Sequence, residues 1–165
     1  MGIWENLRDK VLGDKVRIQS CGELSNESCP EVFKLMNMVA EARQNEGRAL
    51  VGHLNRSINL AITPAPVNWT GPLEPMKVGK GDCKAYSIAK YVGALEAGIP
   101  MNYARVVIVH DKRHHEYHMV TAVYENDEWL VLDNLNMLLL QDSETRDYEP
   151  IAVLDHKGVR RYPTL

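Results

Sequence analysis

The chain has 165 residues, of which 45% are hydrophobic and 25% are charged, and its formal net charge is −3. This length suits one domain with a sizeable core, and the small acidic balance gives no reason to expect a nucleic acid or a membrane surface as partner. No apolar run approaches the ~20 residues that cross a bilayer, so we expect a soluble protein without membrane insertion.

Residues 1–28 are expected to form an N-terminal arm, and residues 29–165 the core of a single domain. The arm has no continuous apolar stretch of the kind that a signal peptide needs. The three cysteines are too few for a disulfide scaffold. Cys21 and Cys29 lie close together and either bridge in an oxidising compartment or stay reduced in a reducing one. Cys83 is left without a partner cysteine.

Two helices are predicted at the start of the core. Ser28 and Glu31 fit a capping box, in which both side chains accept otherwise unpaired backbone N–H groups. The helix that follows has apolar residues at helical spacing and is expected to run to about Gly47. A second helical segment places four apolar side chains on its inner face: Leu50, Val51, Leu54 and Ile58.

Residues 63–81 are rich in Pro and Gly. We expect them to be irregular, because proline interrupts the hydrogen bonding of both helices and sheets. A loop of this length inside a compact domain is typically functional or disordered. Because it leads directly to Cys83, we expect it to form one wall of a functional site.

The stretch GKGDCKAYSIAKYVGALEAGIP, residues 79–100, predicts a helix. Its apolar residues recur at three- and four-residue spacing, and Gly98 and Pro100 end it. Asp82 and Cys83 fall at its start rather than on the apolar stripe. The free N–H groups and the dipole of a helix N-terminus favour negative charge, so a thiol placed there is favoured as the nucleophilic thiolate.

After this helix, the spacing of apolar residues changes to the alternation that is typical of strands. Strands are predicted at 104–110, 117–125 and 128–134, with a tight hairpin between the last two, and a further strand at 151–154. Helices followed by antiparallel strands indicate an α+β fold, with the helices packed on one side of a sheet.

A cysteine nucleophile needs a base, and the base needs a group that orients it. If Asn126 and Asp127 form a two-residue turn, His118 is diagonal to Asp133 on the same face of the sheet, within hydrogen-bonding reach of its side chain. A turn with one residue more or fewer would place the two on opposite faces. His118 and Asp133 are therefore the predicted base and orienting group for Cys83.

Together these motifs resemble the bacterial transglutaminase-like cysteine peptidases. The similarity rests on WTGPLEP, on GDCKAY at a helix start, and on HMVTAV and LVLDN in strands, and it spans about residues 41–134. The resemblance implies a papain-like fold of the transglutaminase branch and a thiol protease with a catalytic triad. Carried over to this chain, Cys83 is the nucleophile, His118 the general base and acid, and Asp133 the orienting residue.

The implied reaction is hydrolysis of an amide bond in a protein or peptide through a thioester acyl-enzyme. The backbone N–H of Cys83 is a predicted oxyanion donor, and Trp69 or Asn68 is the candidate for a second one. Asp82 is a further candidate for substrate binding. Transfer of the acyl group to an amine stays open, as do the substrate sequence and the oligomeric state. The resemblance points to the periplasm, whereas the lack of a signal peptide points to the cytoplasm.

One departure from the family concerns calcium. The family commonly has two acidic residues directly after the cysteine, and these help to hold the ion in calcium-dependent members. Lys84 and Ala85 take these positions here. Since calcium prefers about six to eight oxygen ligands, we expect the site to be lost and no metal or other cofactor to be needed. Lys84 instead adds positive charge beside the thiolate.

Two other functional classes stay open. The altered GDCKAY motif is compatible with a protein that keeps the fold to bind peptides or partner proteins and has little or no catalytic activity. A metal site could instead form from His114, His118 and Cys83, although the strand spacing keeps the two histidines apart. Otherwise, His110, His114 and His115 are expected to be exposed to solvent around the charged connection between two strands.

Overall fold

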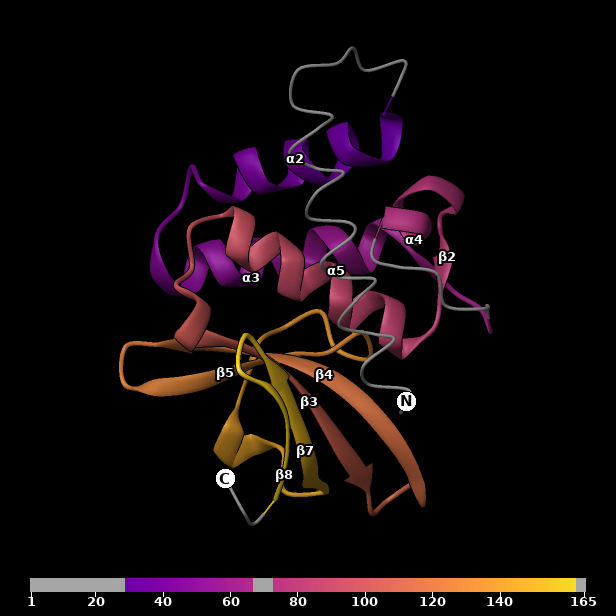
Figure 1. Ribbon diagram of the computed structural model, residues 1–165, viewed down its shortest axis with the longest axis vertical. Helices are drawn as coiled ribbons and strands as arrows, with labels where there is room; N and C mark the ends of the chain where they lie inside the picture. Colours follow the sequence, from indigo (N-terminus) through magenta and orange to yellow (C-terminus); the bar gives the residue numbers. More distant parts are fainter. Residues whose placement is uncertain (1–28, 67–72, 163–165) are drawn as a thin grey trace.

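The computed structural model describes residues 29–66 and 73–162. In this part of the chain, helices lie over one face of an antiparallel sheet (Figure 1), which confirms the predicted α+β fold. The expected arm, residues 1–28, lies outside the described residues, as does Ser28 of the predicted capping box. Cys29 is a half-cystine, but Cys21, its predicted partner, also lies outside them.

The first two described helices, α2 (Pro30–Ala42) and α3 (Gly47–Ala61), pack against each other. The prediction that the first of them runs to about Gly47 is wrong. Glu46 is extended, with φ −127° and ψ 158°, and interrupts the helical path before α3 begins. The predicted inner face of α3 packs on the core: Val51, Leu54 and Ile58 are 0% exposed, and Leu50 is half-buried against the same core.

The segment 63–81 is more regular than predicted. β1 (Thr63–Pro64) and β2 (Lys80–Gly81) pair in parallel, and α4 (Leu73–Val78) lies between them. The prediction of an irregular segment is wrong because Pro75 lies in the first turn of α4. Backbone N–H groups there make no hydrogen bond within the helix, so proline interrupts none. Gly81 is closely surrounded, since a Cβ there would lie 2.7 Å from the Cβ of Ala85. Glycine therefore lets β2 approach the next helix.

The main sheet of the described residues has six antiparallel strands in the order β6-β5-β4-β3-β7-β8. Four of them occupy predicted segments: β3 (Ala104–Asp111), β4 (Glu116–Glu125), β5 (Glu128–Leu132) and β7 (Tyr148–Asp155). Two were not predicted, because β6 (Leu140–Gln141) is too short to show alternation and β8 (Gly158–Arg161) has a single apolar side chain, Val159.

β7 begins earlier than predicted, at Tyr148. Proline normally argues against a strand because it cannot donate to the ladder. Here Pro150 is opposite Val109, directly beside a register shift in the β3–β7 pairing that leaves Ile151 unpaired. The irregularity accommodates the proline, and it brings Tyr148 into the sheet.

The central helix of the described residues is α5 (Cys83–Glu96), whose residues 85–94 are all buried. It contacts α2 and α3 as well as β3 and β4, so apolar neighbours surround it. A second, smaller apolar cluster covers the opposite face of the sheet and comprises Val107, Val109, Val120, Ala122, Val131 and Val153. No helix among the described residues is long and apolar enough to cross a membrane.

Candidate active site

The position of Cys83 is set by the cap of α5. Asp82 is the N-cap residue, and its Oδ1 accepts the backbone N–H of Ala85 at 3.1 Å. Cys83 is the first residue of the helix, is half-buried and carries a free thiol. At this position its own backbone N–H has no partner within the helix. The start of α5 therefore presents N–H groups and the positive end of the helix dipole beside the thiol.

The β4–β5 hairpin has the predicted two-residue turn. Asn126 and Asp127 take φ values of 51° and 64°, the left-handed conformation that a type I′ turn requires. The ladder keeps one register from this turn to the pair Thr121 and Leu132. Because the turn has an even number of residues, residues 118 and 133 fall on the same side of the sheet.

This register brings His118 and Asp133 together. His118 Nε2 lies 2.7 Å from Asp133 Oδ1, and the two residues are 8% and 1% exposed. Since Nε2 faces the carboxylate, Nδ1 is left for another partner. The Cys83 side chain also interacts electrostatically with the His118 ring. The structure therefore brings the His118 imidazole together with the Asp133 carboxylate and with the side chain of Cys83.

Two buried hydroxyl groups fix the start of α5 against the strand that carries His118. Thr121 Oγ1 donates to the carbonyl oxygen of Ser87 at 2.6 Å. Ser87 Oγ lies 2.8 Å from the carbonyl oxygens of both Met119 and Cys83. Because Ser87 and Thr121 are 2% and 0% exposed, water does not compete for these hydrogen bonds, and the distance between thiol and imidazole is held by the fold.

His118 and Asp133 stabilise each other's charged form. Burial by itself would lower the pKa of His118, but the hydrogen bonds to Asp133 and Cys83 and the charges of both outweigh it and raise the pKa to about 9. Burial likewise opposes ionisation of Asp133, yet the His118 hydrogen bond holds the pKa of Asp133 below its ordinary value. An imidazolium and a carboxylate are therefore the favoured forms near neutral pH.

Further groups hold Asp133, and no local sequence pattern indicates them. The Tyr148 hydroxyl donates to Asp133 Oδ2 at 2.6 Å, and the backbone N–H of Leu135 donates to Oδ1 at 3.1 Å. From α3, the Asn59 side-chain amide donates to the backbone carbonyl of Asp133 at 3.0 Å. The Tyr148 ring also lies 5.6 Å from the ring of His118. Burial and the carboxylate raise the pKa of Tyr148 well above its ordinary value, so the hydroxyl remains a donor.

A cleft of about 930 Å³ opens beside Cys83 and His118. Its floor includes a row of side chains across neighbouring strands, in which Met119 pairs with Ile108 and Ile108 with Ala152. The remaining lining is mixed in character and comprises Lys84, Tyr117, Glu149, Pro150, Ile151, Arg161 and Tyr162.

The structure leaves two predicted site residues undetermined. Trp69 and Asn68, the candidates for the second oxyanion donor, lie outside the described residues. Asp82 is described, and both of its carboxylate oxygens have partners: Ala85 N–H at Oδ1, and the Lys84 ammonium at Oδ2, 2.8 Å away. Capping and ion pairing therefore account for this side chain.

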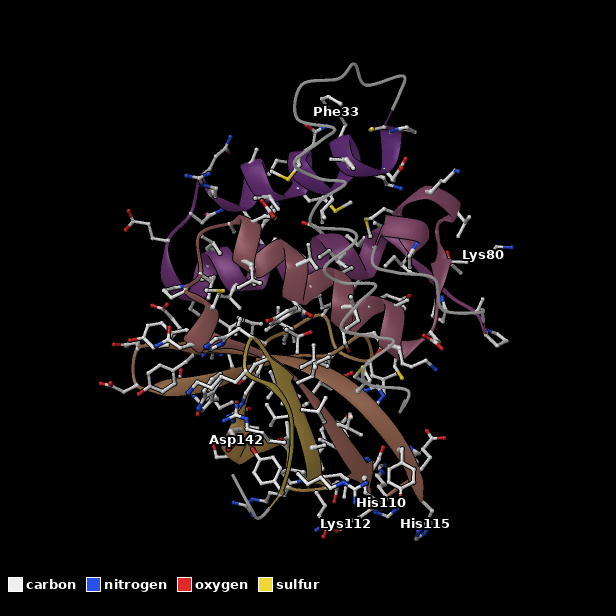
Figure 2. All side chains as sticks on the ribbon, viewed as in Figure 1. Phe33, Lys80, His110, Lys112, His115 and Asp142 are labelled. Carbon is white, nitrogen blue, oxygen red and sulfur yellow. The ribbon has the colours of Figure 1, made fainter. Side chains whose placement is uncertain are left out.

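The other histidines of the β3–β4 hairpin lie apart from this site. Figure 2 shows His110 and His115 at the end of the sheet that points away from the helices. His114 and His115 are exposed, as predicted. His110 is half-buried, contrary to prediction, because its ring packs 5.5 Å from that of Tyr117. Among the described residues, no three or more His, Cys, Asp or Glu side chains are placed to share a metal ion.

The residues around Asp82 do not fit a calcium ion. Lys84 brings an ammonium group to the oxygen that a cation would need, and Ala85 carries no ligand. The ion pair with Asp82 raises the pKa of Lys84, so this ammonium stays charged. A divalent cation would have to displace it and would then find few oxygen ligands.

Comparisons with solved structures show the same fold in other proteins. LapG of Legionella pneumophila is 21% identical, with a TM-score of 0.71 over 92% of this chain and 87% of that chain. A calcium-bound form of the same protein gives the same values. A structure described as a TGase is 15% identical, with a TM-score of 0.50 over 73% of this chain and 36% of that one.

Among curated proteins, no sequence matches this chain significantly. The family model of the bacterial transglutaminase-like cysteine proteinases matches residues 18–153, which is most of the sequence. This match includes Cys83, His118 and Asp133. The chain therefore belongs to the bacterial transglutaminase-like cysteine proteinase family.

Proposed function

We propose that the protein is a cysteine peptidase that hydrolyses an amide bond of a protein or peptide substrate. The observation that carries the proposal is the position of the His118 ring, which hydrogen-bonds with Asp133 and interacts with Cys83 beside a cleft that both Cys83 and His118 line. Covalent catalysis on a carbonyl group needs a nucleophile, a base and a group that orients the base. Membership of a cysteine proteinase family supports the same reaction.

In the first half of the reaction, the thiolate of Cys83 attacks the carbonyl carbon, and the electron pair of the C=O bond moves onto oxygen. The His118 imidazolium then donates its proton to the leaving nitrogen, the C–N bond breaks and a thioester forms. Asp133 keeps the ring aligned and stabilises its positive charge while the proton waits to be transferred.

In the second half, neutral His118 takes a proton from water as the water oxygen attacks the thioester. The C–S bond breaks, the carboxylic acid product leaves, and the thiolate–imidazolium pair is restored. An amine in place of water would give a new amide by the same steps, so hydrolysis and acyl transfer differ only in which nucleophile reaches the thioester.

The oxyanion that forms in both halves needs hydrogen-bond donors beside the carbonyl oxygen. The backbone N–H of Cys83 supports this role, because it is at the first position of α5. Trp69 and Asn68 remain the candidates for the second donor, since their segment leads toward the cysteine in the sequence.

We also propose that this activity does not require calcium. The support is the Asp82–Lys84 ion pair at 2.8 Å, which supplies a built-in cation where calcium-dependent members use further carboxylates. Dialysis against a chelator is expected to leave both the turnover rate and the melting temperature unchanged. Lost activity that returns with calcium, and not with magnesium, would contradict the proposal.

The peptidase proposal is tested by mapping which cysteine reacts and whether that reactivity produces cleavage. At about pH 6, limiting iodoacetamide is expected to alkylate Cys83 of the full chain first, as identified by peptide mass spectrometry. His118→Ala and Asp133→Ala should slow this alkylation, whereas the matched variant His114→Ala should not. A peptide mixture should yield new termini with the wild type and none with Cys83→Ala.

Two results would overturn the proposal. If Cys83 reacts no faster than an ordinary thiol, the thiolate–imidazolium pair does not exist. If Cys83 reacts fast but neither cleavage nor amine transfer occurs with any peptide, the fold serves binding rather than catalysis.

A further inference from the structure

Tyr117 is an exposed aromatic residue next to the proposed catalytic base. It directly precedes His118 on β4 and is 72% exposed. It also lines the cleft that Cys83 and His118 line, although no step of the proposed reaction uses it. A ring this exposed leaves a large apolar area in contact with water, so a ligand in the cleft that covers the ring removes this area from water.

The position of the Tyr117 ring is supported by His110. The two residues are directly opposite each other in the β3–β4 pairing, and their ring centroids lie 5.5 Å apart with an angle of 63° between the ring planes. Aromatic pairs favour such an edge-to-face arrangement. His110 is half-buried on β3, an interior strand of the sheet. The tyrosine ring therefore has a support at the cleft and loses less conformational freedom when a ligand binds.

The cleft floor beside this ring is apolar. Met119 is two residues from Tyr117 on β4, so both side chains extend from the same face of the strand. Met119 pairs with Ile108, and Ile108 pairs with Ala152. All three line the cleft and are between 4% and 7% exposed. A nearly buried apolar floor beside an exposed ring forms a subsite that suits an apolar side chain of a ligand.

The charged residues on β7 and β8 that line the cleft lie farther from Tyr117. Glu149 is on β7 and Arg161 on β8, and β3 separates both strands from β4. Glu149 and Tyr117 pair with the same residue of β3. Since neighbouring strands are about 4.8 Å apart, the backbones of Glu149 and Tyr117 are about 10 Å apart. Lys84 of α5 is ion-paired with Asp82 at 2.8 Å. The part of the cleft beside Tyr117 therefore favours an uncharged side chain.

We propose that Tyr117 is a specificity-determining residue, whose ring forms, with Met119 and Ile108, a subsite for a large apolar side chain close to the scissile bond of a peptide substrate. This inference rests on the proposed function, because it names the substrate class of the same cleft. A large apolar side chain covers both the ring and the floor, and this burial contributes binding free energy. An alanine side chain is too small to cover both.

The first experiment measures binding without catalysis, in the full chain with Cys83→Ala. The probes are two short capped peptides of glycine and serine that differ only in a central phenylalanine or alanine. NMR titration should show shifts of the Met119 methyl signal with the phenylalanine peptide, and a Kd about tenfold lower than with the alanine peptide. Tyr117→Ala should abolish this difference between the peptides, and Tyr117→Phe, which keeps the ring, should preserve it.

Tyr103→Ala is the matched control. Tyr103 is also exposed, at 42%, and its ring also packs against another aromatic ring, that of Tyr124 at 5.6 Å. It directly precedes the end of β3 opposite to His110 and is not among the residues that line the cleft. This variant should keep the wild-type preference for the phenylalanine peptide. Melting temperatures of all variants show that each is folded.

The second experiment measures turnover in the chain that keeps Cys83. For a peptide cleaved next to a phenylalanine, Tyr117→Ala should raise KM by about tenfold and leave kcat nearly unchanged, because it removes binding that the substrate and the transition state share. With alanine in place of that phenylalanine, the same substitution should change KM little. A merely structural role of Tyr117 would affect both peptides equally.

The inference and the proposed function fail in different ways. If the phenylalanine peptide binds no more tightly than the alanine peptide, if neither binds at millimolar concentration, or if Tyr117→Ala keeps the preference, the subsite does not exist, even when Cys83 cleaves peptides. If the preference depends on Tyr117 but no peptide is cleaved by the wild type, the subsite exists and the peptidase proposal is wrong.

Discussion

The described residues contain two histidine–aspartate pairs, and both have a nitrogen–oxygen distance of 2.7 Å. His114 lies in the turn between β3 and β4, and Asp111 is the last residue of β3, whereas His118 lies on β4 and Asp133 directly after β5. The side chain of His114 is 58% exposed, and that of His118 is 8% exposed. The same contact therefore occurs once at the surface and once inside the molecule.

The two pairs form for different reasons. Asp111 Oδ1 also accepts the backbone N–H groups of Arg113 and His114, so the surface pair is part of a turn built from neighbours in sequence. The buried pair requires a hairpin of the correct register and a helix that brings Cys83 to the other side of the imidazole. A short histidine–aspartate distance thus does not identify a catalytic site. The buried pair differs from the surface pair in its burial and in the interaction of its imidazole with the Cys83 side chain.

The largest expected effect separates the two histidines. His118→Ala removes the group that both accepts and donates the proton, so we expect kcat/KM to fall by about 10²- to 10⁴-fold. His114→Ala removes a histidine with the same aspartate contact and should leave the rate unchanged. The measurement is kcat/KM for peptide cleavage by the His118→Ala and His114→Ala variants. Equal losses would mean that the surface pair also belongs to the site.

Substitution of Asp133 should slow the reaction of Cys83 and substitution of Asp111 should not, and the effect should be smaller than that expected for His118→Ala. Asp133→Asn keeps an oxygen for His118 but removes the negative charge that stabilises the imidazolium, so the alkylation rate of Cys83 should fall by on the order of 10²-fold. Asp111→Asn should affect only the β3–β4 turn. If Asp133→Asn retains the wild-type rate, the carboxylate orients nothing that the reaction needs.

The parts of this site that are predictable from sequence are those that depend on local rules. Side chains alternate along a strand, so the parity of the turn at Asn126 and Asp127 suffices to place His118 and Asp133 on one face. Likewise, the apolar spacing of α5 and its capping residue are local properties, and they place Cys83 at a helix start. No knowledge of the strand order is needed for either inference.

The parts that are not predictable depend on packing between distant segments. Tyr148 reaches Asp133 because β7 pairs with β3, a neighbour that no local pattern specifies. Asn59 reaches the backbone carbonyl of Asp133 from α3, a contact between segments that lie far apart in the sequence. The short helix α4 was missed for another reason: the effect of Pro75 depends on its distance from a helix start that the sequence does not mark.

The two pairs should also respond to pH in opposite directions. The pKa of His118 is raised from 6.5 to about 9, so its stabilising contribution is complete below about pH 6.5 and is lost as the pH rises through about 9. The His114 hydrogen bond instead lowers the pKa of Asp111 from 3.8. That contribution is present above about pH 3.8 and is lost as the pH falls.

Urea unfolding of the wild type and of each alanine variant tests this difference. The free energy of unfolding lost in His118→Ala should be on the order of 2 kcal/mol larger near pH 6 than near pH 10. Peptidase activity should decrease over the same alkaline range, because the leaving nitrogen then lacks its proton donor. A loss in His118→Ala that grows toward pH 10 would reverse the assigned sign.

The smallest expected effect concerns the group that the buried pair has and the surface pair lacks. Tyr148 donates to the second oxygen of Asp133 at 2.6 Å, whereas His114 is the partner described for the second oxygen of Asp111. Tyr148→Phe keeps the ring against His118 and removes only this hydrogen bond. Asp133 can then rotate, so we expect the Cys83 alkylation rate to fall by about tenfold or less.

Tyr124→Phe is the matched control, because the Tyr124 hydroxyl meets Asp127 at 3.4 Å on the surface. It should change neither the alkylation rate nor its pH dependence. In Tyr148→Phe, the Asp133 carboxylate loses a donor, so its pKa should move up toward the ordinary value and the acid limb of the rate profile should shift to higher pH. A lower rate with an unshifted acid limb would mean that Tyr148 acts through packing on His118 rather than through its hydroxyl.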